Sequence, residues 1–333
     1  MASLTKDRIE TLFNRFSSKR IIVIGDLMLD HYVWGNVSRI SPEAPVPVVD
    51  VASESFMFGG SANVVHNVIT LGSEVIPVGV IGSDEYGDML KGLFKERNVS
   101  TDGLLIDRSR PTIVKTRIIA HNQHVVRVDR ELRGYVDTGL QDRIIEFILD
   151  RIDEIDGVIF QDYDKGVCTP KIITSVIDTA VSKNKMVFVD PKFDNFFHYK
   201  GATLFKPNRL EVSNRLNIRL DSEEEIEKAG KELLRRLESQ AVLITLGENG
   251  MALFEGSKKW LHIKTRARRV HDVSGAGDTV IAAAAVAMIS GATAPEAANI
   301  ANFAAGIVCG ELGVVPVEKE RLFNLLMEQT RGS

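Results

Sequence analysis

The chain of 333 residues has little cysteine and no long apolar segment. Its two cysteines, Cys168 and Cys309, lie far apart and lack the spacing of metal ligands, which argues against a disulfide framework and is typical of a reducing compartment. The longest apolar run, 280–289, is about half as long as a membrane span. Residues 1–10 are polar and mixed in charge, unlike a signal peptide. We therefore expect a soluble cytoplasmic protein.

Charge of either sign is also not in excess. The sequence has 41 Lys and Arg against 45 Asp and Glu, a net charge of -4. Such a balance gives no support for binding to nucleic acid or to a membrane surface. The sequence shows no internal repeat, low-complexity segment or obvious linker. We expect a single domain over residues 1–333.

Strand and helix patterns alternate along most of the chain. Apolar strands are expected at 20–25, 157–160, 186–189, 203–205 and 241–245, with helices at 4–17, 64–71, 170–183 and 223–238. This alternation predicts an α/β fold with a mostly parallel central sheet and helices on both faces. Segments at about 31–53 and 112–129 read as strands outside the repeat, the second with a turn at Asn122. They predict a small β lid over the sheet edge.

Polar residues follow nearly every expected strand, where open α/β sheets bind ligands. They are Asp26, Asp30, Asp162, Lys165, Asp190, Lys192, Asn208, Glu211, Thr245 and Gly247. For Asp26 and Asp30, capping of a turn is an equally good interpretation. The turn 58–63 brings Gly59, Gly60 and Asn63 to a helix start, where backbone and amide groups could contact sugar hydroxyls.

The segment 271–279 has the most specific chemistry. Gly275 and Gly277 flank Ala276 at an expected helix start, and strong helix formers follow. The first N–H groups of a helix have no partner inside it, so this turn can hold phosphate oxygens. Asp278 in the same turn is expected to stay ionised beside these donors and to accept a proton from a hydroxyl. Taken alone, such a turn is more often structural, with Asp278 as a partner of the helix dipole.

Four motifs together resemble the ribokinase or PfkB family of carbohydrate kinases: Gly59–Asn63, Asn208–Glu211, Thr245–Gly250 and Asp272–Thr279, with Ser274 where Thr is usual. The resemblance implies a ribokinase-like fold and phosphoryl transfer from ATP, with Asp278 as general base and residues 275–278 as anion hole. It implies sugar contacts from Asp30, Gly59, Gly60 and Asn63. It assigns the nucleotide to Asn208, Arg209, Leu210, Glu211, Thr245, Gly247, Gly250 and Asn302. Mg²⁺ would be bound mainly by ATP phosphates, with Glu211 acting through water.

Segments 25–30, 38–48, 161–166 and 190–192 are similar to the heptose 7-phosphate kinases of ADP-heptose and lipopolysaccharide synthesis. This similarity implies phosphorylation of the anomeric C1 hydroxyl of D-glycero-D-manno-heptose 7-phosphate, by a homodimer. Two-domain members also carry a nucleotidyltransferase motif, which is absent here, so a stand-alone kinase is expected. Candidate contacts to the substrate are Arg39, Lys115, Arg117, Asp162, Lys165 and Lys192, although each basic residue could equally be a solvated surface group. The alternatives are a kinase of another sugar, sugar phosphate or nucleoside, and a binding protein without catalysis.

Overall fold

The computed structural model describes residues 4–121, 123–266, 273–311 and 313–331. His271 and Asp272, which open the expected anion-binding motif, lie outside the described residues, as does Asn122 of the expected hairpin turn. Among the described residues, no helix is long and apolar enough to cross a membrane.

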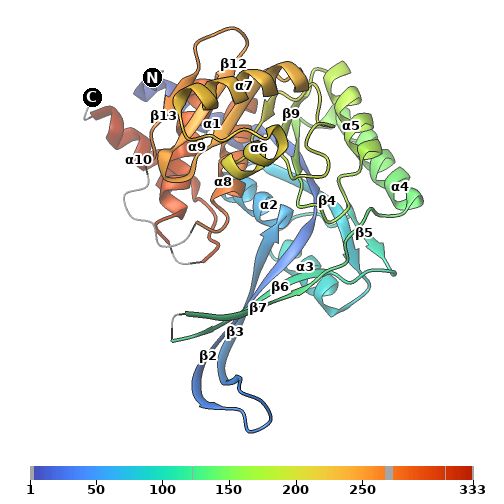
Figure 1. The fold of residues 1–333 in the computed structure, drawn as a ribbon. Coiled ribbons are helices and arrows are strands. Elements are labelled where there is room, and N and C mark those ends of the chain that lie inside the picture. Colours follow the sequence, from blue (N-terminus) through green and yellow to red (C-terminus); the bar gives the residue numbers. More distant parts are fainter. Residues whose placement is uncertain (1–3, 122, 267–272, 312, 332–333) are drawn as a thin grey trace.

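A nine-stranded sheet forms the centre of the molecule (Figure 1). Its strands run in the order β13 (Leu261–Ile263), β12 (Met251–Glu255), β11 (Ala241–Thr245), β10 (Leu204–Phe205), β9 (Met186–Asp190), β8 (Gly157–Gln161), β1 (Arg20–Gly25), β4 (Glu74–Gly82) and β5 (Leu104–Asp107). All neighbours pair in parallel except at β12 and β13, which continue the sheet antiparallel. The expected mostly parallel sheet is therefore confirmed.

Helices cover both faces of this sheet, because neighbouring strand residues point to opposite sides. In β1, Ile21 and Val23 pack in one apolar core, and Ile22 and Ile24 pack in the other. The first core contains side chains of α1 (Lys6–Arg15), α2 (Ser61–Thr70), α3 (Glu85–Lys95), α8 (Ala276–Ile289), α9 (Ala294–Val308) and α10 (Lys319–Arg331). The second contains those of α4 (Thr138–Leu149), α5 (Pro170–Ser182), α6 (Arg209–Leu216) and α7 (Glu223–Leu237).

A second, four-stranded sheet projects from the body (Figure 1). Its order is β3 (Pro47–Gly60), β2 (Leu27–Ile40), β6 (Ile113–Ala120) and β7 (Gln123–Arg130), with two antiparallel hairpins joined by the parallel pair β2–β6. This smaller sheet is the expected lid. Its first hairpin is longer than the sequence indicated, because Pro42 and Pro45 fall in the connecting loop and leave the strands unbroken.

The helix α8 is buried along nearly its whole length, since every residue from Asp278 to Ile289 is inaccessible to solvent or nearly so. Alanine side chains let it pack closely against α2, α9 and the sheet. The helix α2 begins at Ser61, three residues earlier than the sequence indicated, so Asn63 lies in its first turn. These two helix starts meet beside the carboxyl ends of β1 and β8, where Asn63 contacts Asp278.

Candidate active site

Asp278 lies in the first turn of α8 and receives hydrogen bonds from three side chains. Asn63 Nδ2 donates to Oδ2 at 2.8 Å, while the Tyr163 hydroxyl and Gln161 Nε2 donate to Oδ1 at 2.7 and 3.1 Å. These donors come from α2, from the end of β8 and from the loop that follows β8. Oδ1 therefore has two donors and Oδ2 one, which leaves a lone pair on Oδ2 for a substrate hydroxyl.

Burial raises the pKa of Asp278 to about 6. The hydrogen bonds from Asn63 and Tyr163 oppose this shift, Asp190 adds to it by repulsion, and the positive charge of Lys206 opposes it. From the sequence, backbone donors were expected to favour the ionised form of Asp278. The structure instead gives a carboxylate with side-chain donors and a raised pKa, which suits a general base that works near neutral pH.

The N-terminus of α8 leaves backbone donors for an anion. Gly275 has φ 77° and caps the helix, and its carbonyl accepts from Thr279 N–H at 3.0 Å. Helix geometry leaves Gly277 and Asp278 N–H without a partner inside the helix. Ala276 N–H donates to Val273 O at 3.2 Å, so one of the expected anion-hole donors has a partner in this structure.

Lys206, which sequence reasoning missed, places a positive charge next to this turn. Its side chain is 2% exposed and forms a salt bridge of 3.0 Å with Asp190. A Cβ added at Gly277 would lie 3.6 Å from Lys206 Nζ. A lysine directly after an apolar strand and before Pro207 was an available signal, because buried lysines are rare unless paired.

Gln161 and Tyr163 were also missed as partners of Asp278. Within the segment 161–166, only Asp162 and Lys165 were expected as site residues, and nothing in the sequence indicated which side chains point to α8. Buried Asp26 accepts the N–H groups of Tyr163, Lys165 and Val167 at 2.9 to 3.1 Å, and so holds this loop in place. Asp26 therefore stabilises a turn, which was the alternative to a direct contact with the ligand.

The expected sugar contacts lie together where the lid meets the start of α2. Asp30 on β2 forms an ion pair of 2.5 Å with Arg117 of β6. A Cβ added at Gly59 would lie 2.9 Å from the carboxyl carbon of Asp30. Gly60 has φ 54°, and a Cβ there would lie 2.6 Å from Asp26 O. Both glycines are required by close packing and backbone conformation, and they connect the lid to α2.

The other residues expected to contact the substrate differ in their partners and positions. Asp162 accepts the Tyr199 hydroxyl at 2.7 Å and Asp164 N–H at 2.9 Å, so its carboxylate is engaged within the protein. Lys192 pairs with Glu211 at 2.5 Å. Exposed Arg39 lies nine residues beyond Asp30 on β2, roughly 30 Å away at ~3.3 Å per residue. The structure therefore does not bring Arg39 to Asp278 within one chain.

A cavity of about 440 Å³ brings together four of the expected nucleotide residues with the start of α8. Its walls include Thr245, Gly247, Gly250, Met251, Ala276, Gly277, Val280, Asn302, Ala305 and Cys309. Gly250 has φ 83°, and a Cβ there would lie 2.0 Å from Ile263 O, so only glycine fits. Asn302 Nδ2 donates to Lys264 O at 2.8 Å. The apolar cavity opens at the anion-binding turn, as a nucleotide site requires.

The segment 208–211 does not line this cavity. Asn208 and Glu211 form a reciprocal cap at the start of α6, with hydrogen bonds of 2.8 and 2.9 Å. Arg209 pairs with Asp221, and Leu210 is 63% exposed. Among the described residues, no three His, Cys, Asp or Glu side chains gather as a metal site.

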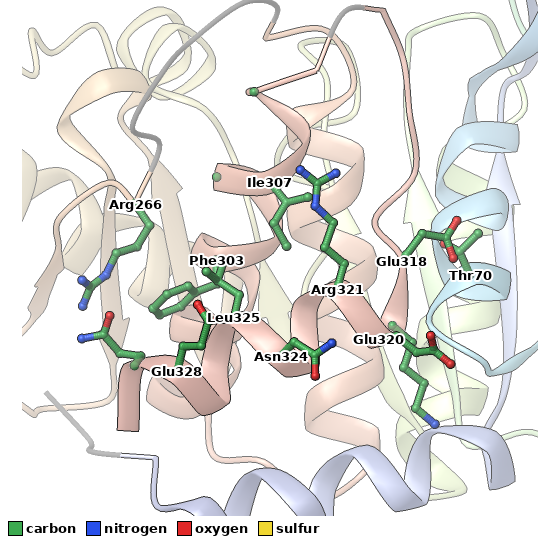
Figure 2. Close-up of a pocket in the computed structure, with 14 residues that line it drawn as sticks. Thr70, Arg266, Phe303, Ile307, Glu318, Glu320, Arg321, Asn324, Leu325 and Glu328 are labelled. Atoms are coloured by element: carbon green, nitrogen blue, oxygen red, sulfur yellow. The ribbon is translucent and has the colours of Figure 1, made fainter. Parts of the chain in front are cut away.

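A larger cavity, of about 1220 Å³, lies elsewhere. Figure 2 shows Phe303, Ile307 and Leu325 of α9 and α10 on its wall. None of the residues expected to bind substrate or nucleotide lines it. The candidate active site is therefore the smaller cavity at Gly277 together with the polar groups around Asp278.

Comparison with known proteins agrees with this geometry. The model of the pfkB family carbohydrate kinases matches residues 18–320. "Bifunctional protein HldE" of Pelobacter propionicus is 42% identical over 321 residues, which cover 96% of this chain and 66% of that protein. The HldE of a Nitratiruptor species is 45% identical over 304 residues, covering 91% and 64%. The chain thus spans about two thirds of the length of these curated relatives.

A likeness to solved structures supports the same fold. The structure of Arabidopsis thaliana ribokinase complexed with ribose and ATP matches with a TM-score of 0.72 and 20% sequence identity. The match covers 92% of this chain and 98% of the other. The ribokinase-like fold expected from the sequence is confirmed.

Proposed function

Because this chain belongs to the pfkB family of carbohydrate kinases, we propose that it transfers the γ-phosphoryl group of ATP to the anomeric C1 hydroxyl of D-glycero-D-manno-heptose 7-phosphate. The observation that carries the proposal is the position of Asp278. It lies between the polar surface of Asp30 and Asn63 and the cavity at Gly277. The choice of acceptor rests on the similarity of segments 25–30, 38–48 and 161–166 to heptose 7-phosphate kinases, together with the HldE relatives.

The proposed reaction is an in-line displacement. Asp278 takes the proton of the C1 hydroxyl, the C1 oxygen forms a bond to the γ-phosphorus, and the bond from that phosphorus to the leaving oxygen of ADP breaks. Oδ2 is the better placed acceptor atom, because Oδ1 already receives two hydrogen bonds. With a pKa of about 6, Asp278 is largely ionised at pH 7 and ready to accept the proton.

Charge that builds up on the transferred group is stabilised by this chain's own donors. Gly277 and Asp278 N–H point from the helix start, and the Lys206 ammonium lies beside Gly277. Phosphoryl transfer depends chiefly on such positioning and charge stabilisation. Mg²⁺ would be bound mainly through ATP phosphates, whose charge it would neutralise, and Glu211 would act only through water, because its Oε1 is engaged by Lys192 and its Oε2 by Asn208 N–H.

We also propose that the protein forms a homodimer through the small sheet. Large apolar side chains are exposed on its strands and on the loop between β2 and β3, namely Trp34, Ile40, Val46, Val51, Met57, Val125, Val126 and Val128. Exposed apolar side chains gathered on one element are typical of an interface.

The test of function is ADP release from magnesium-ATP with D-glycero-D-manno-heptose 7-phosphate, beside fructose 6-phosphate, ribose and adenosine. We expect turnover with the heptose phosphate and a loss of ~10²–10⁴ in rate in Asp278→Asn. Turnover with a different acceptor would discard the heptose assignment and keep the kinase. No turnover with any acceptor, while ATP or sugar still binds, would favour a binding protein without catalysis.

A further inference from the structure

A cluster of charged side chains joins the lid to the loop after β8. We call it the Glu131 cluster; it consists of Lys115, Arg127, Asp129, Glu131, Arg133 and Lys165. Glu131 lies at its centre, directly after β7, and bridges two ammonium groups. Lys115 contacts its Oε2, and Lys165 contacts its Oε1 at 2.9 Å. Lys115 also pairs with Asp129 at 3.1 Å.

This cluster has more positive charge than its carboxylates neutralise. It contains four cations and two carboxylates, and the two excess charges are those of Arg127 and Arg133, whose side chains are 56% and 80% exposed. Its centre is shielded from water, because the side chains of Lys115, Glu131 and Lys165 are only 10%, 11% and 13% exposed. Charges held in such surroundings are costly unless they are paired. Lys115 and Lys165 are already paired with Asp129 and Glu131, so a phosphate would bind both ammonium groups by taking the place of the Glu131 carboxylate, and a phosphate dianion carries enough charge to do so.

The cluster also lies on the substrate side of the lid. Lys115 pairs in register with Asp30, and alternate residues of a strand share a face, so Lys115 and Arg117 lie on the face that carries Asp30. On the body, Lys165 follows Tyr163 by two residues, and the Tyr163 hydroxyl contacts Asp278. The cluster and Asp278 are thus connected both through the lid and through the loop. A sugar between them would have its reacting hydroxyl at Asp278 and its far end at Lys115 and Lys165.

We propose that the Glu131 cluster binds the phosphate of a phosphorylated acceptor sugar, and that Glu131 is an internal counterion with which this phosphate competes. The inference rests on the proposed function and extends it to the recognition of the acceptor. The bridging carboxylate occupies the position in which phosphate oxygens would meet both ammonium groups. Burial raises the pKa of Glu131, but hydrogen bonds from Lys115 and Lys165 outweigh burial and hold the pKa at about 2. Glu131 is therefore ionised at neutral pH, and the incoming phosphate competes with a full negative charge.

Two substitutions of opposite expected effect test the proposal. Lys165→Met removes a charged contact to phosphate, so KM for heptose 7-phosphate rises ~10- to 100-fold, while KM for ATP is unchanged. Glu131→Gln removes the competing charge and lowers KM for heptose 7-phosphate. With the heptose that lacks the phosphate as acceptor, neither substitution changes KM by more than about twofold. Lys183→Met is the control. Lys183 follows the last residue of α5 and forms an exposed ion pair with Asp153, away from the cluster.

Thermal stabilisation by heptose 7-phosphate gives a readout that does not depend on turnover. We expect wild-type protein to be stabilised and Lys165→Met to lose most of the effect. KM for heptose 7-phosphate could be unchanged in Lys165→Met, or it could rise as much in Glu131→Gln as in Lys165→Met. Either result would show that the cluster only holds the lid against the loop after β8 and does not bind phosphate. Lysine-dependent stabilisation without turnover would discard the proposed reaction and keep this binding site. Turnover with a KM for heptose 7-phosphate that is the same in wild type and in Lys165→Met would keep the proposed reaction and discard this binding site.

Discussion

Substitution of Tyr163 tests whether the proposed base is tuned by its neighbours. The Tyr163 hydroxyl donates to Oδ1 of buried Asp278 at 2.7 Å, and this hydrogen bond lowers the pKa of the carboxyl group. Tyr163→Phe removes the donor and keeps the ring. The pKa of Asp278 should therefore rise above its present value of about 6. Asp190 remains as the repelling charge, and Lys206 as the attracting one.

The size of this rise follows from the energy of one charged hydrogen bond. Such a bond contributes ~1.5–3 kcal/mol, and one pKa unit corresponds to ~1.4 kcal/mol, so the pKa should rise by ~1–2 units. At pH 6.5 the ionised fraction of Asp278 would then fall ~3- to 25-fold. At pH 9 the base would be ionised in both proteins, so most of the difference should disappear.

The assay is kcat/KM for the acceptor between pH 5 and 9, because this ratio reports the pKa values of the free enzyme. We expect the acidic limb of the profile to move to higher pH in Tyr163→Phe. Tyr135→Phe is a matched control, since the Tyr135 hydroxyl binds Asn195 at 2.9 Å. An acidic limb that stays in place or moves to lower pH, in a variant with normal thermal unfolding, would refute the role given to Tyr163.

Three further predictions concern the turn, the cavity and the lid. Gly275→Ala places a Cβ 2.9 Å from Asn63 Nδ2 at φ 77°, so kcat should fall at least ~10-fold and thermal stability should drop; wild-type kcat would contradict this. Ala305→Phe narrows the 440 Å³ cavity and should raise KM for ATP but not for the sugar, as steady-state kinetics can show. Light scattering at micromolar concentration should find a dimer in the wild type and a monomer in Val126→Glu; a monomeric wild type would exclude the proposed interface.

Five strands of the central sheet could be predicted, because they are short apolar runs that alternate with helix patterns, whereas β4, β5, β12 and β13 were not predicted. The boundaries of the lid were harder. The first lid segment was expected at about 31–53, whereas β2 and β3 run from Leu27 to Gly60 around a loop that contains Pro42 and Pro45. Nothing in local sequence shows that β2 pairs in parallel with β6, because that pairing depends on how the two hairpins meet in three dimensions.

The candidate site was predictable where backbone chemistry decides it. Gly275 and Gly277 before an alanine-rich helix indicate an anion-binding turn, and Asp278 follows from its place in that turn. Side-chain partners were not predictable in the same way. Tyr163 lies more than a hundred residues from Asp278 in the sequence. Its hydroxyl contacts Asp278, and Asp26 holds the loop that carries Tyr163 in place. Such contacts come from tertiary packing, which a single sequence does not encode locally.

Two buried carboxyl groups at this site, Asp162 and Asp278, should contribute less to stability as pH rises. Burial, with repulsion from Asp26, raises the pKa of Asp162 to about 7, and burial raises that of Asp278 to about 6. Both values exceed the 3.8 of an unperturbed Asp, so the folded state binds protons more tightly than the unfolded state. The contribution of these two groups to the free energy of unfolding is therefore fully present below pH ~4 and is lost as pH rises towards ~7.

Asp162→Asn separates this cost from catalysis. The amide can still accept Asp164 N–H and can donate to the Tyr199 hydroxyl, but it carries no charge. Each pKa unit corresponds to ~1.4 kcal/mol. Between pH 5 and pH 8, the free energy of unfolding should therefore decrease less in the variant than in the wild type, by a difference of at least ~1 kcal/mol. Urea unfolding at both pH values measures this difference. Equal losses in the two proteins would mean that Asp162 is neutralised in the folded state by a partner other than a proton.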